Sequence, residues 1–390
     1  MTAPFVLAGL LTFIGAAAEF QGAPAQRDVT AEQVRTAIGQ LGTLEFTVRM
    51  EAARTVRRAA PAVAVPALTD AVSAHPDGYV RFRALVLLSG FNDPRTRDVM
   101  TRMLEEKNDR LRAVAYAYFE HNPDPAALPR LIDALSREES EFVRPALTRA
   151  IAAYGNEPRA RDTMVALVPR GQDFFRGAVI EAIGDYRGAY AFDALTAVAR
   201  LEGPLQDDAV LALGKIGDKR ALTTFAALQQ TAPRATQPAI AAAICLIGVN
   251  CGSHQRYLTE TISFAIANAG FQDLLRGAAA GLAALAVSGN ESAMRTLIEL
   301  GAPSRDPARA AIALALGTVA LRNTPLALKV LEDESLHEGG IELLREAFDM
   351  LEEDFIEERF FVAVRRAYWQ AAEGSPTRKA AEALIRKLEF

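Results

Sequence analysis

The chain of 390 residues is poor in cysteine, in aromatic residues and in clustered positive charge. Its two cysteines exclude a disulfide-stapled scaffold. Aromatic residues make up 7%, and no sustained apolar–polar alternation occurs, which argues against a large sheet. The net charge of −5, without a run of Lys or Arg, gives no general attraction for nucleic acid. What remains is a chain that is 50% hydrophobic and dominated by alanine and leucine, a composition typical of closely packed helices.

The sequence also lacks the usual catalytic motifs. We find no HExxH, paired Cys-x-x-Cys, Gly-x-Ser-x-Gly, Walker loop or dinucleotide-binding glycines. The four histidines, which are His75, His121, His254 and His337, are far apart. The spacing Cys251-x-x-His254 resembles a metal site, but a helix turn with a polar cap is the interpretation that we favour. We therefore predict no catalytic residue, no cofactor and no metal.

Cys245 and Cys251 lie in the segment "ICLIGVNC". A bridge between them is conceivable if a turn after the helix folds Cys251 back. An unpaired, buried Cys245 is the interpretation that we favour, because free cysteine packs as a small hydrophobic residue.

The segment "FVLAGLLTFIGAAA" at residues 5–18 is an uninterrupted apolar run. Its length fits the core of a signal peptide and falls short of the roughly 20 residues that a membrane helix needs. We predict a signal peptide over residues 1–25 and a bacterial protein exported to the periplasm or cell envelope. No Lys or Arg precedes the run, so a buried or uncleaved anchoring helix remains the alternative.

An arginine recurs at a nearly constant interval, early in one predicted helix of each unit. This arginine ladder consists of Arg49, Arg81, Arg112, Arg144 and Arg176, and returns at Arg276 and Arg309. An acidic residue three or four positions earlier lies on the same helix face as most of these arginines. Stacked units also let each arginine reach an acid or carbonyl of the neighbouring unit. We predict a structural ladder, with a row of ligand-binding arginines as the alternative.

Each unit reads as two helices joined by a short turn. Thr30 and Gln33 form a capping box that predicts a first helix at 30–42. Pro94, Pro125 and Pro158 follow Asn or Asp-type turns and fit the first turn of a helix. The motif Ile-Gly-Asp-x-Arg occurs twice, at 183–187 and at 216–220. Its glycines, Gly184 and Gly217, are predicted to end helices in a conformation with positive φ.

The units resemble HEAT repeats, in particular the short repeats of the phycobilisome lyase type. The matching segments are "VRFRALVL" at 80–87, "VRPALTRA" at 143–150 and "AVLALGKIGDKRAL" at 209–222. The resemblance implies an all-α fold, an α-solenoid of stacked helical hairpins. We expect an N-terminal spacer and first helix at 26–43, the repeat solenoid at 44–331, and C-terminal capping helices at 332–390.

The C-terminal segment is acidic and then aromatic. Residues 332–358 contain twelve Asp or Glu and one Arg. Helical spacing predicts one negative face, formed by Glu342, Glu346, Asp349, Glu353 and Glu357. This face either docks a basic partner or is a solvated cap, which we favour. The aromatic residues Phe355, Phe360, Phe361, Tyr368 and Trp369 are expected to seal the end of the core.

The fold favours a non-enzymatic scaffold that binds a protein or peptide on its concave surface. In this family the second helix of each hairpin is expected to line that surface. The candidate partner-binding residues are Arg95, Asp98, Arg102, Arg130, Asp133, Arg159 and Asp162. The alternatives are an enzyme of the lyase branch, with Asp162 or His254 as the nearest reactive groups, and a nucleic-acid-binding protein, which the negative charge argues against.

Overall fold

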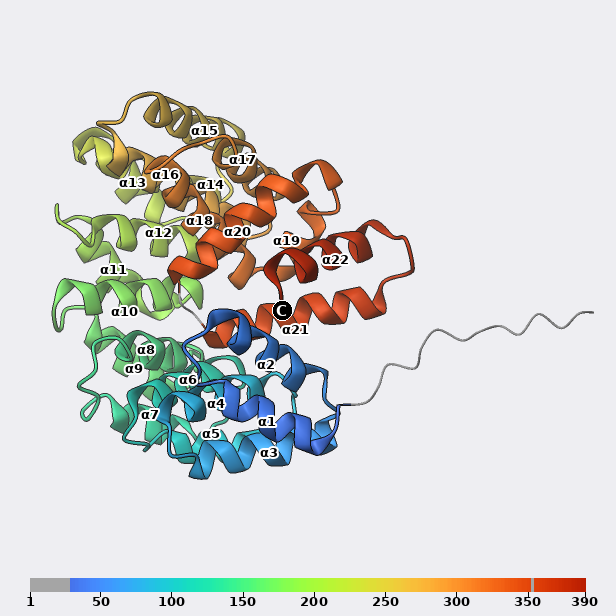
Figure 1. Ribbon diagram of the computed structural model, residues 1–390. Helices are drawn as coiled ribbons and strands as arrows, with labels where there is room; N and C mark the ends of the chain where they lie inside the picture. The colour runs from blue at the N-terminus through green and yellow to red at the C-terminus, as the bar shows by residue number, and fades with distance from the viewer. Residues whose placement is uncertain (1–28, 352–353) are drawn as a thin grey trace, which may run out of the picture.

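The structure is a computed structural model that describes residues 29–351 and 354–390, and all regular elements in those ranges are helical. The predicted signal peptide at 1–25 lies outside the described residues, as does Glu353. The capping box is present, since the Thr30 hydroxyl accepts a hydrogen bond from the Gln33 backbone N–H at the start of the first helix. The predicted all-α solenoid is confirmed: the helices form successive antiparallel hairpins stacked side by side (Figure 1).

The first helices of the hairpins run parallel to one another and form one layer. This inner layer consists of α2 (Phe46–Arg58), α4 (Gly78–Ser89), α6 (Asp109–His121), α8 (Arg144–Ala152), α10 (Asp173–Asp185), α12 (Gln206–Ile216), α14 (Gln237–Leu246), α16 (Gln272–Val287), α18 (Ala308–Arg322) and α20 (His337–Leu351).

The second helices form the outer layer, together with the helix that precedes the first hairpin. They are α1 (Ala31–Gln40), α3 (Pro61–Ala74), α5 (Thr96–Met103), α7 (Leu128–Ala134), α9 (Pro158–Leu167), α11 (Phe192–Ala199), α13 (Ala221–Thr231), α15 (Cys251–Ala267) and α17 (Glu291–Gly301).

The remaining helices complete the C-terminal part and a few turns. They are α19 (Thr324–Val330), α21 (Asp354–Gln370), α22 (Pro376–Leu388), and the short 3-10 helices η1 (Ala189–Ala191), η2 (Arg234–Thr236) and η3 (Glu334–Leu336).

The layers decide which way the solenoid curves. Neighbouring inner helices pack tightly against one another from α6 to α20, whereas the outer helices from α3 to α17 make few contacts with their outer neighbours. The stack therefore bends towards its first helices, which line the concave side. The expectation that the second helices line it is wrong. The order of the two helices in a hairpin can be read from the sequence, but not which of them packs closely against its counterpart in the next hairpin.

Small residues permit the close packing of the inner layer. A Cβ atom added at Gly184 would lie 2.7 Å from the Cα of Ala212, and one at Gly214 would lie 2.5 Å from the Cα of Ala243. Gly217 ends α12 with φ of 79°, as predicted from its motif. Gly184 does not have this role, because it lies inside α10 and its lack of a side chain serves helix contact instead. The two copies of the motif thus use their glycines differently.

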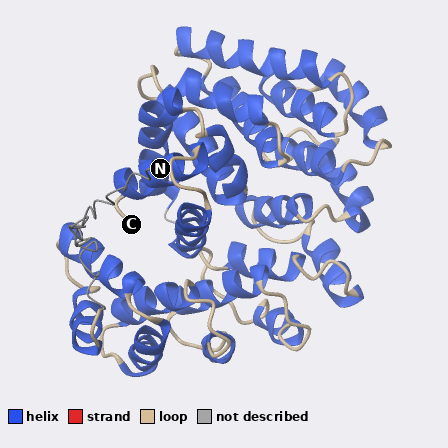
Figure 2. Ribbon diagram, turned by 90° about the vertical axis from the view of Figure 1, so that its right-hand side faces the viewer, coloured by secondary structure: helices blue, strands red, loops and turns tan. Residues whose placement is uncertain are grey.

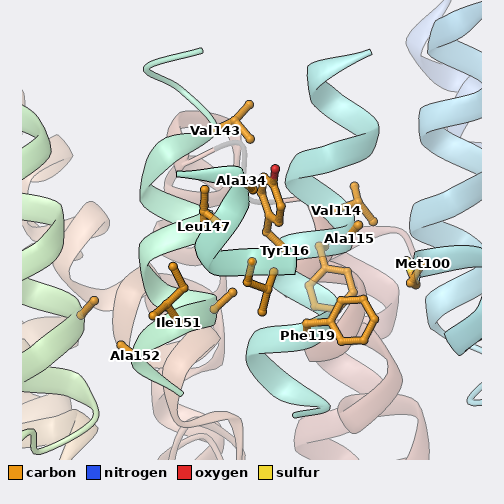
Figure 3. Packing of buried hydrophobic residues seen from close by; sticks show 14 of the residues in the cluster. Met100, Val114, Ala115, Tyr116, Phe119, Ala134, Val143, Leu147, Ile151 and Ala152 are labelled. Carbon is orange, nitrogen blue, oxygen red and sulfur yellow. The ribbon is translucent and has the colours of Figure 1, made fainter. Parts of the chain in front are cut away.

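Buried aliphatic and aromatic side chains fill the space between the layers along the whole stack. Figure 3 shows part of this core, where Leu147 and Ile151 of α8 lie beside Tyr116 and Phe119 of α6. Each hairpin buries its apolar faces against its neighbours, which is the packing expected of a repeat array.

The C-terminal helices do not simply continue the stack. Helix α21 packs against α4 and α6 of the N-terminal hairpins and also against α18 (Figure 1). Phe355, at its start, belongs to the hydrophobic cluster of the N-terminal half. The arch of helices in Figure 2 is therefore closed across its concave side by the chain itself.

Candidate functional site

A network of charged side chains joins the inner helices within the concave side. Arg149 on α8 donates to Glu120 of α6 at 3.0 Å and to Asp185 of α10 at 2.8 Å. Lys215 on α12 donates to Asp185 at 2.6 Å, and the Tyr186 hydroxyl donates to Glu120 at 2.9 Å. The five groups lie on four successive hairpins, because the C-terminal ends of all inner helices meet at one edge of the stack.

The network also reaches across the arch. An Arg322 guanidinium nitrogen, at the end of α18, lies 3.7 Å from Asp185 and 4.0 Å from Glu120. Arg322 and Glu120 belong to opposite halves of the chain, so this contact ties the C-terminal half of the solenoid to its N-terminal half. We call these contacts of Arg149 and Arg322 with Glu120 and Asp185 the clamp.

The surroundings keep the Asp185 carboxyl ionised and the Tyr186 hydroxyl protonated. Burial opposes ionisation of Asp185, but Lys215 and Arg149 outweigh it and hold the pKa of Asp185 below its ordinary value. Burial and the Glu120 carboxylate raise the pKa of Tyr186, so that its hydroxyl remains a donor. A charged pair and a protonated phenol suit a structural clamp better than proton transfer near neutral pH.

The surroundings shift the pKa values of two groups beside the network. Burial, aided by the nearby Glu181, raises the pKa of Asp208 to about 6. Burial and the charge of Arg359 lower the pKa of His121 to about 4, and the His121 ring stacks on Phe355 of α21 at 6.1 Å. Among residues 29–351 and 354–390, no group of three or more His, Cys, Asp or Glu side chains is placed to hold a metal ion.

A second set of contacts fixes α21 to the N-terminal hairpins. Glu358 accepts two hydrogen bonds from Arg57 of α2, at 2.9 and 2.6 Å, and these side chains are only 1% and 6% exposed. Arg365 shares the same carboxylate at 3.3 Å, and Asp354 pairs with Arg83 of α4.

These contacts correct the prediction of one negative face between 332 and 358. The described residues of the segment belong to two helices, α20 up to Leu351 and α21 from Asp354, which run in different directions (Figure 1). Glu346 accepts from Arg309, and Glu342 accepts from Arg345. Arg57, Arg83 and Arg309, which lie far away in sequence, thus neutralise part of the negative charge, and local helical spacing does not reveal these contacts.

The aromatic group divides between core and surface. Phe355, Phe360 and Phe361 are buried, as expected of a core seal, whereas Trp369 is 71% exposed. Tyr368 is half-buried and packs edge-on against Trp369.

The arginine ladder makes contacts between units, and these differ from one member to the next. Arg81, Arg112, Arg176 and Arg309 donate to carbonyls near or just after the end of the preceding outer helix. Arg112 and Arg309 also bind Glu138 and Glu346 of the following unit. Arginine is favourable there because helix C-terminal carbonyls lack partners and carry partial negative charge.

The other three ladder members complete the set. Arg49 donates to the Thr43 and Leu44 carbonyls, and Arg144 lies 4.3 Å from the centre of the Phe175 ring. Arg276 is exposed and pairs with Asp273 three residues earlier on its own helix.

The seven predicted partner-binding residues are all exposed but face away from the concave side. Arg95, Asp98 and Arg102 belong to the region of α5, Arg130 and Asp133 to α7, and Arg159 and Asp162 to α9, all in the outer layer. Arg95 pairs with Asp93 in its own turn at 2.8 Å. They form a mixed-charge convex surface rather than a groove.

The two candidate reactive groups of the enzyme alternative are not brought together, since His254 is on α15 and Asp162 on α9. Cys245 and Cys251 form a disulfide, so the favoured unpaired state is wrong. The turn after α14 folds Cys251 back towards Cys245, and a bridged Cys251 cannot serve as a metal ligand beside His254.

Sequence reasoning missed a surface at the opposite edge, where the inner helices begin. Phe142, Phe174 and Leu201 are 91%, 65% and 66% exposed. They lie in or next to the three successive connections that lead into α8, α10 and α12. We call them the apolar edge. Phe142 and Phe174 each stand two positions before a ladder arginine, and that fixed phase was the available sequence signal.

A pocket of about 460 Å³ opens near the apolar edge. The connections before α6 and α8 supply its acidic lining, which consists of Glu105, Glu106, Glu138 and Glu139. Arg112 and Arg137 are its basic side chains.

Comparisons with known proteins agree with the repeat architecture. Residues 38–120 match the family model of HEAT repeats. A search of curated proteins finds no significant match. Solved structures with a similar arrangement include the complex of CpcE and CpcF of phycocyanin lyase from Nostoc sp. PCC7120, at 19% identity and a TM-score of 0.42, covering 67% of this chain and 97% of that one.

Two further structures show the same level of similarity. The Escherichia coli protein YibA has 18% identity and a TM-score of 0.41, covering 57% of this chain and 83% of that one. Importin beta has 11% identity and a TM-score of 0.38, covering 92% of this chain and 58% of that one. The chain is an α-solenoid of HEAT-like hairpins, and its residues 38–120 are identified as HEAT repeats.

Proposed function

We propose that the chain is a non-enzymatic scaffold that binds a protein or peptide partner. The observation that carries this proposal is the apolar edge. Large apolar side chains that are about two-thirds or more exposed on successive hairpins are costly in water, and surfaces of this kind mark interaction sites. Because the chain's own α21 packs on the concave side of the first hairpins, the edge is a better candidate for a partner than that part of the concave side.

Rigidity supports the same proposal. The clamp through Arg149 and Arg322 and the buried Arg57–Glu358 pair hold the hairpins in one arrangement. A preorganised surface loses little conformational entropy on binding, which favours affinity.

The test is photo-crosslinking in the source organism. A photoreactive amino acid at the exposed positions Gln172 or Pro204, beside the edge, is compared with one at Asp133 on the outer layer. The proposal expects one or a few defined protein adducts at the edge positions, and their loss in the triple variant Phe142→Ser/Phe174→Ser/Leu201→Ser. If the adducts persist in the triple variant, the edge is not the binding surface.

We also propose that the protein works outside the cytoplasm. The apolar run at 5–18 supports export, and the Cys245–Cys251 disulfide suits an oxidising compartment. Within residues 29–351 and 354–390, no single helix is long and apolar enough to cross a membrane. A fusion of residues 1–30 to a reporter that is active only in the periplasm is expected to give signal; a silent reporter contradicts export.

A further inference from the structure

The residues of the apolar edge share a second property. Each is adjacent in sequence to an exposed acidic residue: Glu141 precedes Phe142, Asp173 precedes Phe174, and Glu202 follows Leu201. The combination therefore repeats on three successive hairpins. A solvated surface explains the acids alone, but it gives no reason for an exposed Phe or Leu beside each of them.

Helix chemistry accounts for only one of these acids. Asp173 is the first residue of α10, where a carboxylate interacts favourably with the helix dipole, and it also pairs with Arg176. Glu141 lies three residues before α8 and Glu202 lies four residues before α12, outside the first turn of either helix. Neither forms an ion pair with another described residue. Their charge is available to a partner.

The pocket near Phe142 adds an independent observation. Of its four glutamates, Glu106 pairs with Arg81 and Glu138 pairs with Arg112. Glu105 and Glu139 are exposed and form no ion pair with a described residue. A cationic side chain entering the pocket would meet these two carboxylates, and Glu139 is close to Phe142 along the chain.

On the other side of the pocket, towards α4, the equivalent aromatic side chain is covered by an arginine. Tyr79 is the residue two positions before its ladder arginine there, and the Arg110 guanidinium lies 5.8 Å from the centre of its ring. Arg110 also lies 5.7 Å from the Phe82 ring. The aromatic surface is thus covered by a cation in the hairpins of α4 and α6, and is open in the hairpins of α8 to α12. The open stretch has a defined start.

We propose that the apolar edge, with its flanking acids and the adjacent pocket, binds a basic, apolar segment of a partner protein. This deepens the scaffold proposal and rests on it. Neighbouring helices are spaced by about 8–10 Å, so the three apolar residues span about 20 Å. A segment of about seven residues in polyproline II conformation covers that distance and presents an apolar side chain to the edge at every third position. Lysine or arginine between these positions would meet the acids.

A second copy of the chain is a poorer occupant. Two copies meeting through this edge would bring like-charged acids together, and each chain carries a net charge of −5. Charge complementarity favours a partner segment of the opposite sign.

The experiment selects random peptides on the purified chain and, in parallel, on the triple variant Phe142→Ser/Phe174→Ser/Leu201→Ser. Selected peptides are synthesised, and their binding is measured by fluorescence anisotropy at low and at physiological salt. The control is Leu44→Ser, which alters a 97% exposed apolar residue outside the apolar edge. Circular dichroism verifies that each variant is folded.

We expect peptides enriched in Lys, Arg and apolar residues, at least tenfold weaker binding to the triple variant, and no change for Leu44→Ser. The charge-reversed variant Glu139→Lys/Glu141→Lys/Glu202→Lys is expected to weaken binding at least tenfold while the apolar residues remain. Neutral or acidic selected peptides, an absence of selection, or full binding by the charge-reversed variant overturns the inference.

The outcomes separate this inference from the scaffold proposal. If crosslinked partners are lost in the triple serine variant but retained in the charge-reversed variant, the edge binds a protein whose chemistry differs from that proposed. If the purified chain is a dimer that the triple serine variant converts to monomers, the occupant is a second copy and the inference fails.

Discussion

Replacing Glu358 by glutamine removes one negative charge from the contact between α21 and the N-terminal hairpins and changes little else in shape. The Glu358 carboxylate accepts from Arg57 at 2.6 Å and from Arg365 at 3.3 Å, and it is 1% exposed. Arg57 is 6% exposed and would remain buried without a counter-charge.

The expected cost follows from that burial. Removing one partner of a buried ion pair costs about 3–5 kcal/mol, because the remaining charge is uncompensated. Since a domain is stabilised by only about 5–15 kcal/mol, this is a large part of the total. The triple variant Arg57→Met/Glu358→Leu/Arg365→Met removes all three charges of this contact and is expected to recover most of the loss.

Urea unfolding measures the effect with two probes. Trp369 is the only tryptophan and lies on α21, so its fluorescence follows the closing helix, while circular dichroism follows all helices. Glu342→Gln is the control, because its pair with Arg345 is exposed and worth at most about 1 kcal/mol. If Glu358→Gln lowers the free energy of unfolding by no more than Glu342→Gln does by both probes, α21 is not held as described.

Four further predictions concern the inner layer. Arg112→Ala is expected to lower the free energy of unfolding in urea by about 2–4 kcal/mol, because Arg112 binds two carbonyls and a buried glutamate. The control Arg276→Ala, at an exposed position, is expected to lower it by under about 0.5 kcal/mol. Equal losses would contradict the structural ladder. The folded structure lowers the pKa of His121 from 6.5 to about 4, so between these pH values the side chain takes up a proton only when the chain unfolds. This uptake lowers the free energy of unfolding by up to about 3 kcal/mol as the pH falls from 6.5 to 4. His121→Gln is expected to flatten that part of the pH profile measured by urea unfolding. The folded structure raises the pKa of Asp208 from 3.8 to about 6, so the ionised carboxylate destabilises the fold at pH 7. Asp208→Asn is therefore expected to raise the free energy of unfolding by up to about 3 kcal/mol at pH 7 and to have no such effect at pH 4. A difference between the two chains that stays constant over this range would refute the raised pKa. Gly214→Ala places a methyl group 2.5 Å from the backbone of the next helix and is expected to cost at least about 1–3 kcal/mol by thermal unfolding, whereas an unchanged Tm would show that the layers are looser than described.

Local signals in the sequence were sufficient to predict the repeats and many helix ends. The ladder arginines all lie on or next to inner helices, and Pro158 begins α9 as its position indicates. Pro94 and Pro125 lie in the turns two and three residues ahead of α5 and α7, so the turns were predicted but the exact first residues were not. Periodicity and capping depend on near neighbours in the chain, which is why they can be read from it.

The predictions from the sequence that proved wrong concern features that depend on contacts between distant residues. Nothing near Glu358 in sequence shows that its carboxylate meets Arg57, which is 301 residues away in the chain. The acidic segment therefore suggested a solvated or partner-binding face. The exposed seven residues on α5, α7 and α9 were predicted as exposed but placed on the wrong side, because hairpin order does not reveal the direction of curvature. Phe142 and Phe174 were not singled out in the sequence, because the exposure of a side chain in a connection depends on how the neighbouring hairpins pack.

Small-angle X-ray scattering of the purified chain tests the closed solenoid most directly. A compact fold of this length has a radius of gyration of about 21 Å, and the closed arch is expected to give about 21–25 Å. An open stack of ten hairpins at about 10 Å each would be about 100 Å long, with a radius of gyration of about 30 Å. A measured value within the range of the closed arch agrees with α21 bridging it, whereas a value as large as that of the open stack, with an elongated profile, would contradict it.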